Sequence, residues 1–362
     1  MEFTGFMRGM GIGGWLTNYK RFNVLPQKWR LALSPGDFEH FRTYITKRDV
    51  DYIAELGMDH IRLGFDQIVL EEKCGVYREE ILGLLDDFVQ WCEEAGVHVV
   101  LNLHKAVGNY CDIPEEVSLL ESSELQERFL SLWLMLEKRY RNKPELAFEL
   151  LNEVRDVRPE LWNSLAEKTI SALRKENPTR KIIVGGTRWS LPSSLKDLKV
   201  YDDPNVIYTF HCYSPHEFTH QQGVLQPPFL YYNRAMPWPG DIALYRDFHR
   251  FVYGNEHAYE GMTVMDKEFL RRELTPAFDF CRLHPEKILW CGEFGTIRHC
   301  KIQYRENYMR DVISLCRKHG IAYCVWNYLS TPNDGNRFSL VDDDSRKILS
   351  EEMARIIRGE VF

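Results

Sequence analysis

The sequence lacks the features that mark several large classes of protein. It has no basic excess, since 46 Lys and Arg stand against 53 Asp and Glu and the formal net charge is -7, so no nucleic acid partner is indicated. No apolar run approaches the roughly 20 residues of a membrane-spanning helix, and the amino terminus lacks the basic start and apolar core of a secretory signal. We therefore expect a cytoplasmic protein without membrane or nucleic acid partners, provided that no segment precedes the printed sequence.

Motifs for metals and cofactors are also missing. The nine cysteines form no C-x-x-C pair, and His299-Cys300 has no second ligand pair at zinc-finger spacing. Most cysteines lie in apolar runs, where free buried thiols are usual and fit a reducing compartment. The glycine-rich stretch from Gly9 to Gly14 continues as loop sequence, whereas a dinucleotide fingerprint requires a helix there. We expect no metal and no cofactor, and we expect these glycines to allow a tight turn that presents Trp15 or Asn18.

Strand-like and helix-like stretches alternate along the chain, which is typical of βα units and a parallel sheet. We expect eight strands, near residues 6–12, 59–65, 97–103, 146–151, 181–185, 206–211, 288–292 and 322–327. We expect helices near residues 47–56, 80–95, 124–141, 159–176, 266–283, 302–318 and 345–358, and no long helix within 186–205. The pattern predicts an α/β fold, a (β/α)8 TIM barrel that forms a single catalytic domain over residues 1–362.

The active site of such a barrel lies at the carboxyl ends of the strands, so polar and aromatic residues should collect there. Six of the predicted strands meet this expectation. The residues concerned are Arg62, Asn102, His104, Asn152, Glu153, His211, Tyr213, Glu293, Trp326 and Asn327.

Two of these strands end on a carboxylate. Glu153 follows the apolar run 145–151, and Glu293 closes the segment 289–292. A carboxylate at the end of a buried strand is costly to desolvate, so it usually has partners or a task. Either glutamate alone is best explained as a charge that faces solvent. Two of them meeting in one cleft are the minimum equipment for hydrolysing a glycosidic bond.

The longest departure from the βα rhythm is the aromatic-rich stretch 214–265, after the sixth strand. One hypothesis makes it a lid that forms a wall of a sugar-binding groove, since flat aromatic rings stack on the C–H faces of sugars. The alternative is a satellite cluster that only packs on the barrel rim. Further candidate sugar contacts are Trp15, Asn18, Trp189, Trp238 and Asn327.

In combination, these residues resemble glycoside hydrolase family 5, a retaining family of clan A. The active-site set of that family is an Arg, a His, an Asn-Glu pair, a His-x-Tyr, a second Glu and a Trp. Its counterparts here, in the same order, are Arg62, His104, Asn152-Glu153, His211-Cys212-Tyr213, Glu293 and Trp326. The segments 147–152, 291–295 and 325–328 look closest to the leaderless bacterial endoglucanase C group, which also carries an insertion after the sixth strand. Val154 departs from the proline that many relatives have there, without touching the carboxylate.

The resemblance implies a retaining endo-β-1,4-glucanase acting on β-linked glucan oligosaccharides or polysaccharides. Glu153 is then the general acid and Glu293 the nucleophile. Tyr213 and Arg62 are suited to hydrogen-bond Glu293, and Asn152 to hold the sugar 2-hydroxyl. The resemblance also implies that His104 and His211 bind sugar hydroxyls or orient Glu153, and that Trp326 forms a platform under the sugar.

Several alternatives stay open at this stage. Within the family, a β-mannanase and a β-1,3- or mixed-linkage glucanase fit the same residues. A catalytically inactive sugar-binding barrel would have no need to keep Glu153 and Glu293 together. A metal-dependent hydrolase on the same barrel would require His-x-His at the end of the first strand, which has no histidine.

Overall fold

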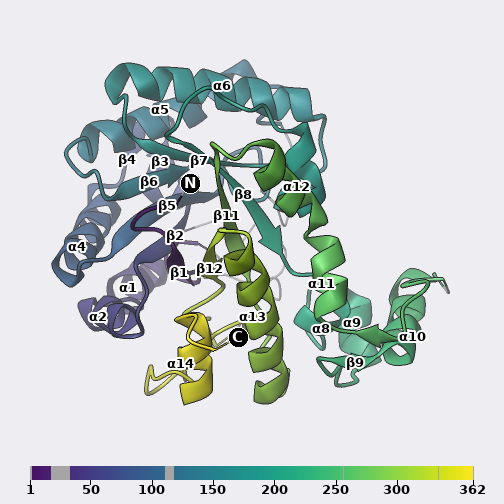
Figure 1. The fold of residues 1–362 in the computed structure, drawn as a ribbon. Coiled ribbons are helices and arrows are strands. Elements are labelled where there is room, and N and C mark those ends of the chain that lie inside the picture. The colour runs from purple at the N-terminus through teal and green to yellow at the C-terminus, as the bar shows by residue number, and fades with distance from the viewer. Residues whose placement is uncertain (1, 18–32, 111–117, 256, 333, 362) are drawn as a thin grey trace.

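The computed structural model describes residues 2–17, 33–110, 118–255, 257–332 and 334–361. Its centre is a closed barrel with the order β1-β12-β11-β8-β7-β6-β5-β2, and every neighbouring pair is parallel (Figure 1). The predicted barrel is confirmed, and each predicted strand overlaps an observed one. The barrel strands are β1 (Arg8–Ile12), β2 (His60–Asp66), β5 (His98–Lys105), β6 (Leu146–Glu149), β7 (Lys181–Gly185), β8 (Val206–Cys212), β11 (Ile288–Phe294) and β12 (Ala322–Val325).

Helices surround the barrel in the places that the sequence predicts, with three differences. The predicted helix 345–358 begins only at Glu351, after the N-cap Ser350. The predicted helix 266–283 is broken into α11 (Lys267–Glu273) and α12 (Thr275–Leu283), because Pro276 starts a new helix. The additional helix α1 (Pro35–Thr43) has no counterpart in the prediction. The other outer helices are α2 (Lys47–Glu55), α4 (Glu79–Ala95), α5 (Ser123–Arg139), α6 (Pro159–Glu176), α13 (Ile302–Lys318) and α14 (Glu351–Ile357).

The short elements fill the connections. After β7 there are only α7 (Thr187–Ser190) and the 3-10 helix Pro192–Asp197, as the absence of a helical pattern indicated. The helix α3 (Gln67–Leu70) and the hairpin of β3 (Glu71–Lys73) and β4 (Val76–Tyr77) follow β2. Within the described ranges, no helix is long and apolar enough to cross a membrane.

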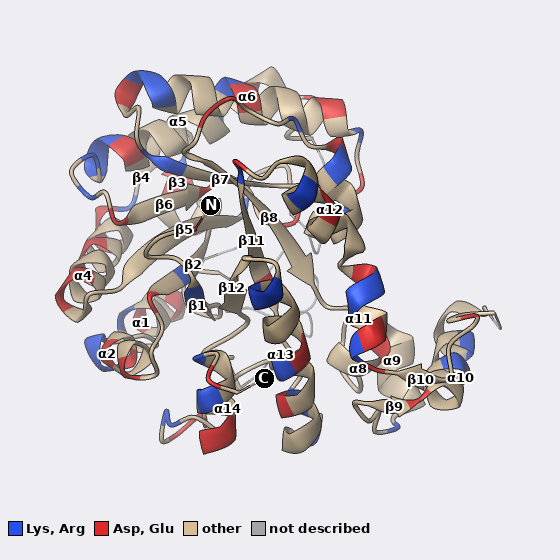
Figure 2. Ribbon diagram, viewed as in Figure 1, with Lys and Arg blue, Asp and Glu red and all other residues tan. Residues whose placement is uncertain are grey.

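Helix α4 illustrates how the sequence pattern produces the outer layer. Its buried residues recur at helical spacing, so one stripe faces the barrel, and each buried Leu or Phe contributes about 1.5–3 kcal/mol. The helix ends at Gly96, whose φ of 70° is the left-handed conformation that glycine adopts at low cost. Charged residues of both signs lie on the outer helices, whereas the barrel strands are mostly uncharged (Figure 2).

The barrel interior is apolar near the amino ends of the strands and polar near their carboxyl ends. The apolar layer includes Val100, Ala147, Ile207 and Trp290. Alternate residues of a strand share a face, so two positions after Val100 and Ala147 the interior carries Asn102 and Glu149, which are also buried. The next inward position of β5 is His104. The fold therefore gathers polar groups at one end of the barrel.

A bulge in β11 decides where Glu293 points. Cys291 pairs with Phe210 and Glu293 pairs with His211, so Gly292 is an extra residue in β11. In a regular strand of the same sequence, without this bulge, the period of two would send Glu293 to the opposite face from Trp290, away from the barrel interior. A Cβ atom at residue 292 would lie 2.5 Å from Thr209 Oγ1, so this position requires glycine.

The insertion 214–265 folds into short elements that lie beside α11 and project from the barrel (Figure 1). Its buried side chains Phe229 and Phe248 pack on each other inside the insertion, whereas Phe218 and Trp238 pack against Tyr308 of α13. This packing accounts for much of its aromatic content, and its action as a lid stays a prediction. Its elements are α8 (His216–Thr219), α9 (Pro227–Tyr232), β9 (Gly240–Asp241), α10 (Ile242–Tyr253) and β10 (Val264–Met265).

Candidate active site

The two predicted glutamates meet at the carboxyl ends of the strands. A carboxylate oxygen of Glu153, a carboxylate oxygen of Glu293 and a ring nitrogen of His211 all lie within 4.8 Å of one another. Glu153 follows β6 with a φ of 43°, a left-handed conformation that costs a residue with a side chain on the order of 1–3 kcal/mol. The surrounding fold holds Glu153 in this conformation, which aims it towards Glu293.

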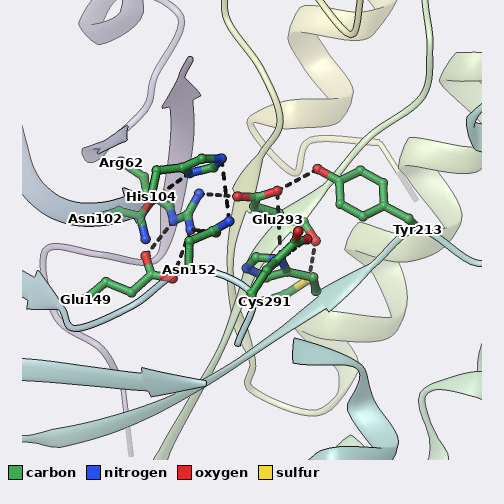
Figure 3. Close-up of polar contacts among 10 residues, drawn as sticks. Arg62, Asn102, His104, Glu149, Asn152, Tyr213, Cys291 and Glu293 are labelled. Carbon is green, nitrogen blue, oxygen red and sulfur yellow. Dashed lines mark hydrogen bonds and ion pairs between the residues drawn. The ribbon is translucent and has the colours of Figure 1, made fainter. Parts of the chain in front are cut away.

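Glu293 is buried among groups that favour its charged form. Tyr213 donates its hydroxyl to Glu293 Oε2 at 2.8 Å, and Arg62 Nη1 donates to Glu293 Oε1 (Figure 3). Burial works against the charge of Glu293, but the charges of His211 and Arg62 and the Tyr213 hydrogen bond outweigh burial and lower its pKa. Glu293 is therefore an ionised carboxylate in a fixed orientation, as a nucleophile requires.

Glu153 has the opposite electrostatic situation. Burial raises the pKa of Glu153, and the charge of Glu293 adds to this effect, although the His211 hydrogen bond opposes it. The side chain of Glu153 is 22% exposed, compared with 5% for Glu293, so Glu153 is the more accessible of the two. Two neighbouring carboxyl groups with pKa values pushed apart are the arrangement of an acid and a nucleophile.

His211 couples the two glutamates. Its Nδ1 lies 3.0 Å from Glu153 Oε1 and 3.8 Å from Glu293 Oε2. Burial lowers the pKa of His211, but the charge of Glu293 and the contact with Glu153 outweigh burial and raise it. The direct contact between His211 Nδ1 and Glu153 Oε1 supports the hypothesis that His211 orients Glu153.

Arg62 connects Glu293 to the rest of the site. Its Nη2 donates to Asn152 Oδ1 at 2.8 Å, and Asn152 Nδ2 lies 3.5 Å from His104 Nε2. The ring of His104 stacks on Trp326 with a centroid distance of 5.6 Å and an interplanar angle of 10°. All eight residues of the predicted family set thus lie in one cluster.

Two further buried residues belong to this cluster. Glu149 was missed as a candidate, and Asn102 was placed at a strand end without a role. Glu149 accepts two hydrogen bonds from Arg62, at 2.6 Å from Nε and 2.9 Å from Nη2 (Figure 3). Asn102 Oδ1 lies 2.9 Å from His104 Nδ1. Glu149 stands inside an apolar strand run, and the signal that could have found it is the period of two from Ala147.

The glycines of β1 and the following turn seat Trp326. Cβ atoms at residues 11 and 13 would lie 2.6 and 2.7 Å from its ring, so the backbone approaches the indole closely only because glycine is there. The tight turn is confirmed by Gly14, which has a φ of 74°. Trp326 remains partly exposed, which a sugar platform requires.

Two further predicted sugar contacts are corrected by the structure. Trp15 is 1% exposed, donates to the carbonyl of Phe41 at 2.6 Å and packs against Phe88. Trp238 is fully buried and donates to Asp311 at 2.9 Å. Neither ring has a face open to a sugar, because residue type alone does not tell whether an aromatic side chain faces a groove or a core.

The remaining predicted contacts have different outcomes. Trp189 is 40% exposed, and its backbone N–H donates to Val154 O at 2.9 Å, next to Glu153. Asn327 is buried, and its Oδ1 accepts from Ser330 at 3.2 Å. Both stay predictions, and Asn18 lies outside the described residues.

Among the described residues, one group has the ligand types of a metal site, namely Glu153, His211 and Glu293. Both carboxylate oxygens of Glu293 already accept hydrogen bonds, and Arg62 supplies a positive charge beside it. The group is explained without a cation, and the expectation of a metal-free site stays a prediction.

Comparison with known proteins adds an independent line of evidence. The family described as Cellulase (glycosyl hydrolase family 5) matches residues 28–331. Endoglucanase C of Acetivibrio thermocellus is 34% identical over 97% of this chain and 98% of its own length. Cellodextrinase A of Ruminococcus flavefaciens is 27% identical over 89% of this chain and 85% of its own length.

A solved structure supports the fold. Cel5A of Thermotoga maritima, crystallised with cellobiose, superposes with a TM-score of 0.75 at 24% sequence identity. The superposition covers 98% of this chain and 97% of the Cel5A chain. The residues 28–331, which match the family model, include Glu153, Glu293 and most of the barrel strands around them. The chain belongs to the cellulase family, glycosyl hydrolase family 5.

Proposed function

We propose that this protein is a retaining endo-β-glucanase that hydrolyses β-1,4-linked glucans through a covalent glycosyl-enzyme. The observation that carries the proposal is the pair Glu153 and Glu293, with oxygens within 4.8 Å and pKa values shifted in opposite directions. Retaining glycosidases hold their carboxyl groups about 5–5.5 Å apart, whereas inverting enzymes separate them by about 6.5–9.5 Å to admit a water.

In the first step, Glu293 attacks the anomeric carbon and the bond to the leaving sugar breaks. Glu153 gives its proton to the leaving oxygen, so the product departs as a neutral alcohol. Tyr213 and Arg62 hold Glu293 on its line of attack. Asn152 stands beside Arg62, where it is suited to hold the sugar 2-hydroxyl as positive charge develops on the ring.

In the second step, the ester at Glu293 carries no charge, so the part of the raised pKa of Glu153 that came from this charge is gone and only the raising effect of burial remains. Glu153 is then ionised and takes a proton from water while the water oxygen attacks the anomeric carbon. The ester bond breaks, Glu293 becomes a carboxylate again and Glu153 has regained its proton. One residue thus serves as acid and then as base because the charge of its neighbour changes.

The β-1,4-glucan substrate is supported by the relatives named endoglucanase and cellodextrinase. The family also leaves a β-mannanase and a β-1,3-glucanase as alternatives, and a catalytically inactive sugar-binding barrel is the alternative from another class. The contacts of Glu153 and Glu293 favour an enzyme, since a binding module has no use for opposite pKa shifts. We keep a cytoplasmic location and one catalytic domain over residues 1–362 as parts of the proposal.

The root of the insertion is the part best placed to form a groove wall. His220 packs edge-on against Tyr213 with a centroid distance of 5.3 Å, and against Phe338 at 5.0 Å. Asn336 Oδ1 accepts from the backbone N–H of Val224 at 2.7 Å, which ties the root to the loop after β12. We expect deletion of part of 214–265 to weaken oligosaccharide binding more than folding. Unchanged affinity would make this part packing only.

The test of the proposal is reducing-sugar release, with product sizes, on a panel of glycans. The panel contains carboxymethyl cellulose, mixed-linkage β-glucan, laminarin, mannan, xylan and cello-oligosaccharides, with Glu293→Gln as the blank. Release of short oligosaccharides from β-1,4-glucans, absent in the blank, is the expected result. Activity on mannan alone would keep the mechanism and change the substrate. No release from any glycan would overturn the proposal in favour of the binding barrel.

A further inference from the structure

Glu149 is the buried carboxylate on which the position of Arg62 depends. It is 1% exposed and lies at the end of β6, inside the barrel. It accepts from Arg62 Nε at 2.6 Å and from Nη2 at 2.9 Å, so it holds one edge of the guanidinium in a bidentate pair (Figure 3). The other edge is left to face Glu293 through Nη1, while Nη2 also reaches Asn152.

The charges of this cluster change during the proposed reaction. In the free enzyme, the Arg62 cation faces Glu149 and the ionised Glu293. In the glycosyl-enzyme, the ester at Glu293 has lost its charge, and Arg62 would be a buried cation without a counter-ion if Glu149 were absent. An uncompensated buried charge is strongly destabilising. Glu149 is not consumed in either step, so it remains as the partner of Arg62 throughout.

We propose that Glu149 is a positioning residue of the reaction, which aims Arg62 at Glu293 and Asn152 and supplies its permanent counter-charge. This inference rests on the proposed function, because it concerns the two steps of a retaining reaction. It assigns a task to a residue that touches no substrate and acts only through Arg62.

The sign of the expected pH effect follows from the charge that is removed. Replacing Glu149 by a neutral residue leaves the Arg62 cation less compensated, and a nearby cation favours the ionised forms of Glu153 and Glu293. Both pKa values then fall. The acidic limb of the activity profile, where Glu293 must be ionised, and the alkaline limb, where Glu153 must be protonated, both move to lower pH.

Other titratable groups face the Arg62–Glu149 pair from the surrounding strands. Burial raises the pKa of Cys324 well above its ordinary value, so this thiol stays neutral. Burial lowers the pKa of His60, which lies below Arg62 on β2. The groups to be considered are His60, His104, Glu153, His211, Tyr213, Glu293 and Cys324.

The test compares Glu149→Gln and Glu149→Asp with the wild-type enzyme on cello-oligosaccharides. The readout is kcat/KM as a function of pH. For Glu149→Gln we expect an optimum lowered by about one pH unit, with kcat reduced about 10- to 100-fold at the wild-type optimum. Glu149→Asp keeps the charge but shortens its reach, so it should lose turnover while its optimum stays at the wild-type pH.

The matched control is Glu137→Gln, which removes the carboxylate of another buried Arg–Glu pair, with Arg180, away from the site. It should lower the melting temperature without moving the pH optimum. Equal pH optima for wild type and Glu149→Gln would overturn the inference. A shifted pH optimum in Glu149→Asp would also overturn it, and this second test holds even if Glu149→Gln does not fold. A wild-type enzyme inactive on every glucan would instead overturn the proposed function.

Discussion

Two buried Arg–Glu pairs, at opposite ends of the barrel, have similar chemistry and different surroundings. Arg180 precedes β7 at the amino end, and its Nε donates to Glu137 at 2.7 Å. Its remaining N–H groups donate to the backbone carbonyls of Tyr140, Lys143 and Leu146. Arg180 is thus fully committed to partners that do not change, and it fastens α5 to the start of β6 and β7.

Arg62, at the carboxyl end, has one permanent carboxylate partner and one reactive one. Glu149 resembles Glu137 in its bidentate contact, but Glu293 carries the proposed chemistry. A buried ion pair is expensive to desolvate. Such pairs also occur as structural networks, so the pair by itself does not identify a functional site. What indicates function at Arg62 is that its partner Glu293 also lies near a second carboxyl group, Glu153, whose pKa is shifted in the opposite direction.

The largest effect should come from the reactive partner of Arg62. Glu293→Gln keeps the shape of the side chain but removes the nucleophile, so turnover should fall on the order of 10⁴-fold or more. Melting temperature and circular dichroism should stay close to the wild type. Activity near the wild-type level in a folded variant would show that Glu293 is not the nucleophile.

Removal of the general acid sharpens the same comparison. Glu153→Gln should lower kcat/KM about 10²- to 10⁴-fold on cello-oligosaccharides, whose leaving group needs a proton. On aryl cellobiosides with good leaving groups, the first step should be nearly unaffected, as measured by the burst of released phenol. An equal loss of that burst and of oligosaccharide hydrolysis would contradict the acid role.

The structural pair should respond in stability and not in chemistry. Glu137→Ala leaves Arg180 as a buried charge without its carboxylate and should destabilise the fold by about 3–5 kcal/mol. Chemical denaturation measures this loss, and kcat per folded molecule should match the wild type. A folded Glu137→Ala with strongly reduced kcat would break the distinction between the two pairs.

The smallest effect concerns stability as a function of pH. The pKa of Glu153 is raised in the folded state, so its protonated form stabilises the fold at pH values below its unfolded pKa. That contribution is lost as the pH rises through the folded value. Glu153→Gln cannot ionise, so its melting temperature should exceed that of the wild type by about 1–2 °C near pH 8. The difference should shrink near pH 4, and a difference independent of pH would contradict the raised pKa.

Much of the site could be predicted because its residues stand at strand ends. A parallel barrel brings the carboxyl ends of all strands together, so Glu153, His211 and Glu293 could be placed in one cluster from their positions alone. Glu149 was missed because it lies within an apolar run, where a polar residue is easily taken for an exposed one. The same lack of information about side-chain direction made Trp15 and Trp238 wrong as sugar contacts.

The sequence by itself determined the alternation of strands and helices, the barrel, and the set of residue types found at the strand ends. The tertiary structure alone decided which way those residues face and which partners they have. The bulge at Gly292 turns Glu293 inward, and Arg62 pairs with Glu149, 87 positions away. The physical reason is that desolvation and charge coupling depend on neighbours distant in sequence, so the opposed pKa shifts of Glu153 and Glu293 exist only once the barrel has closed.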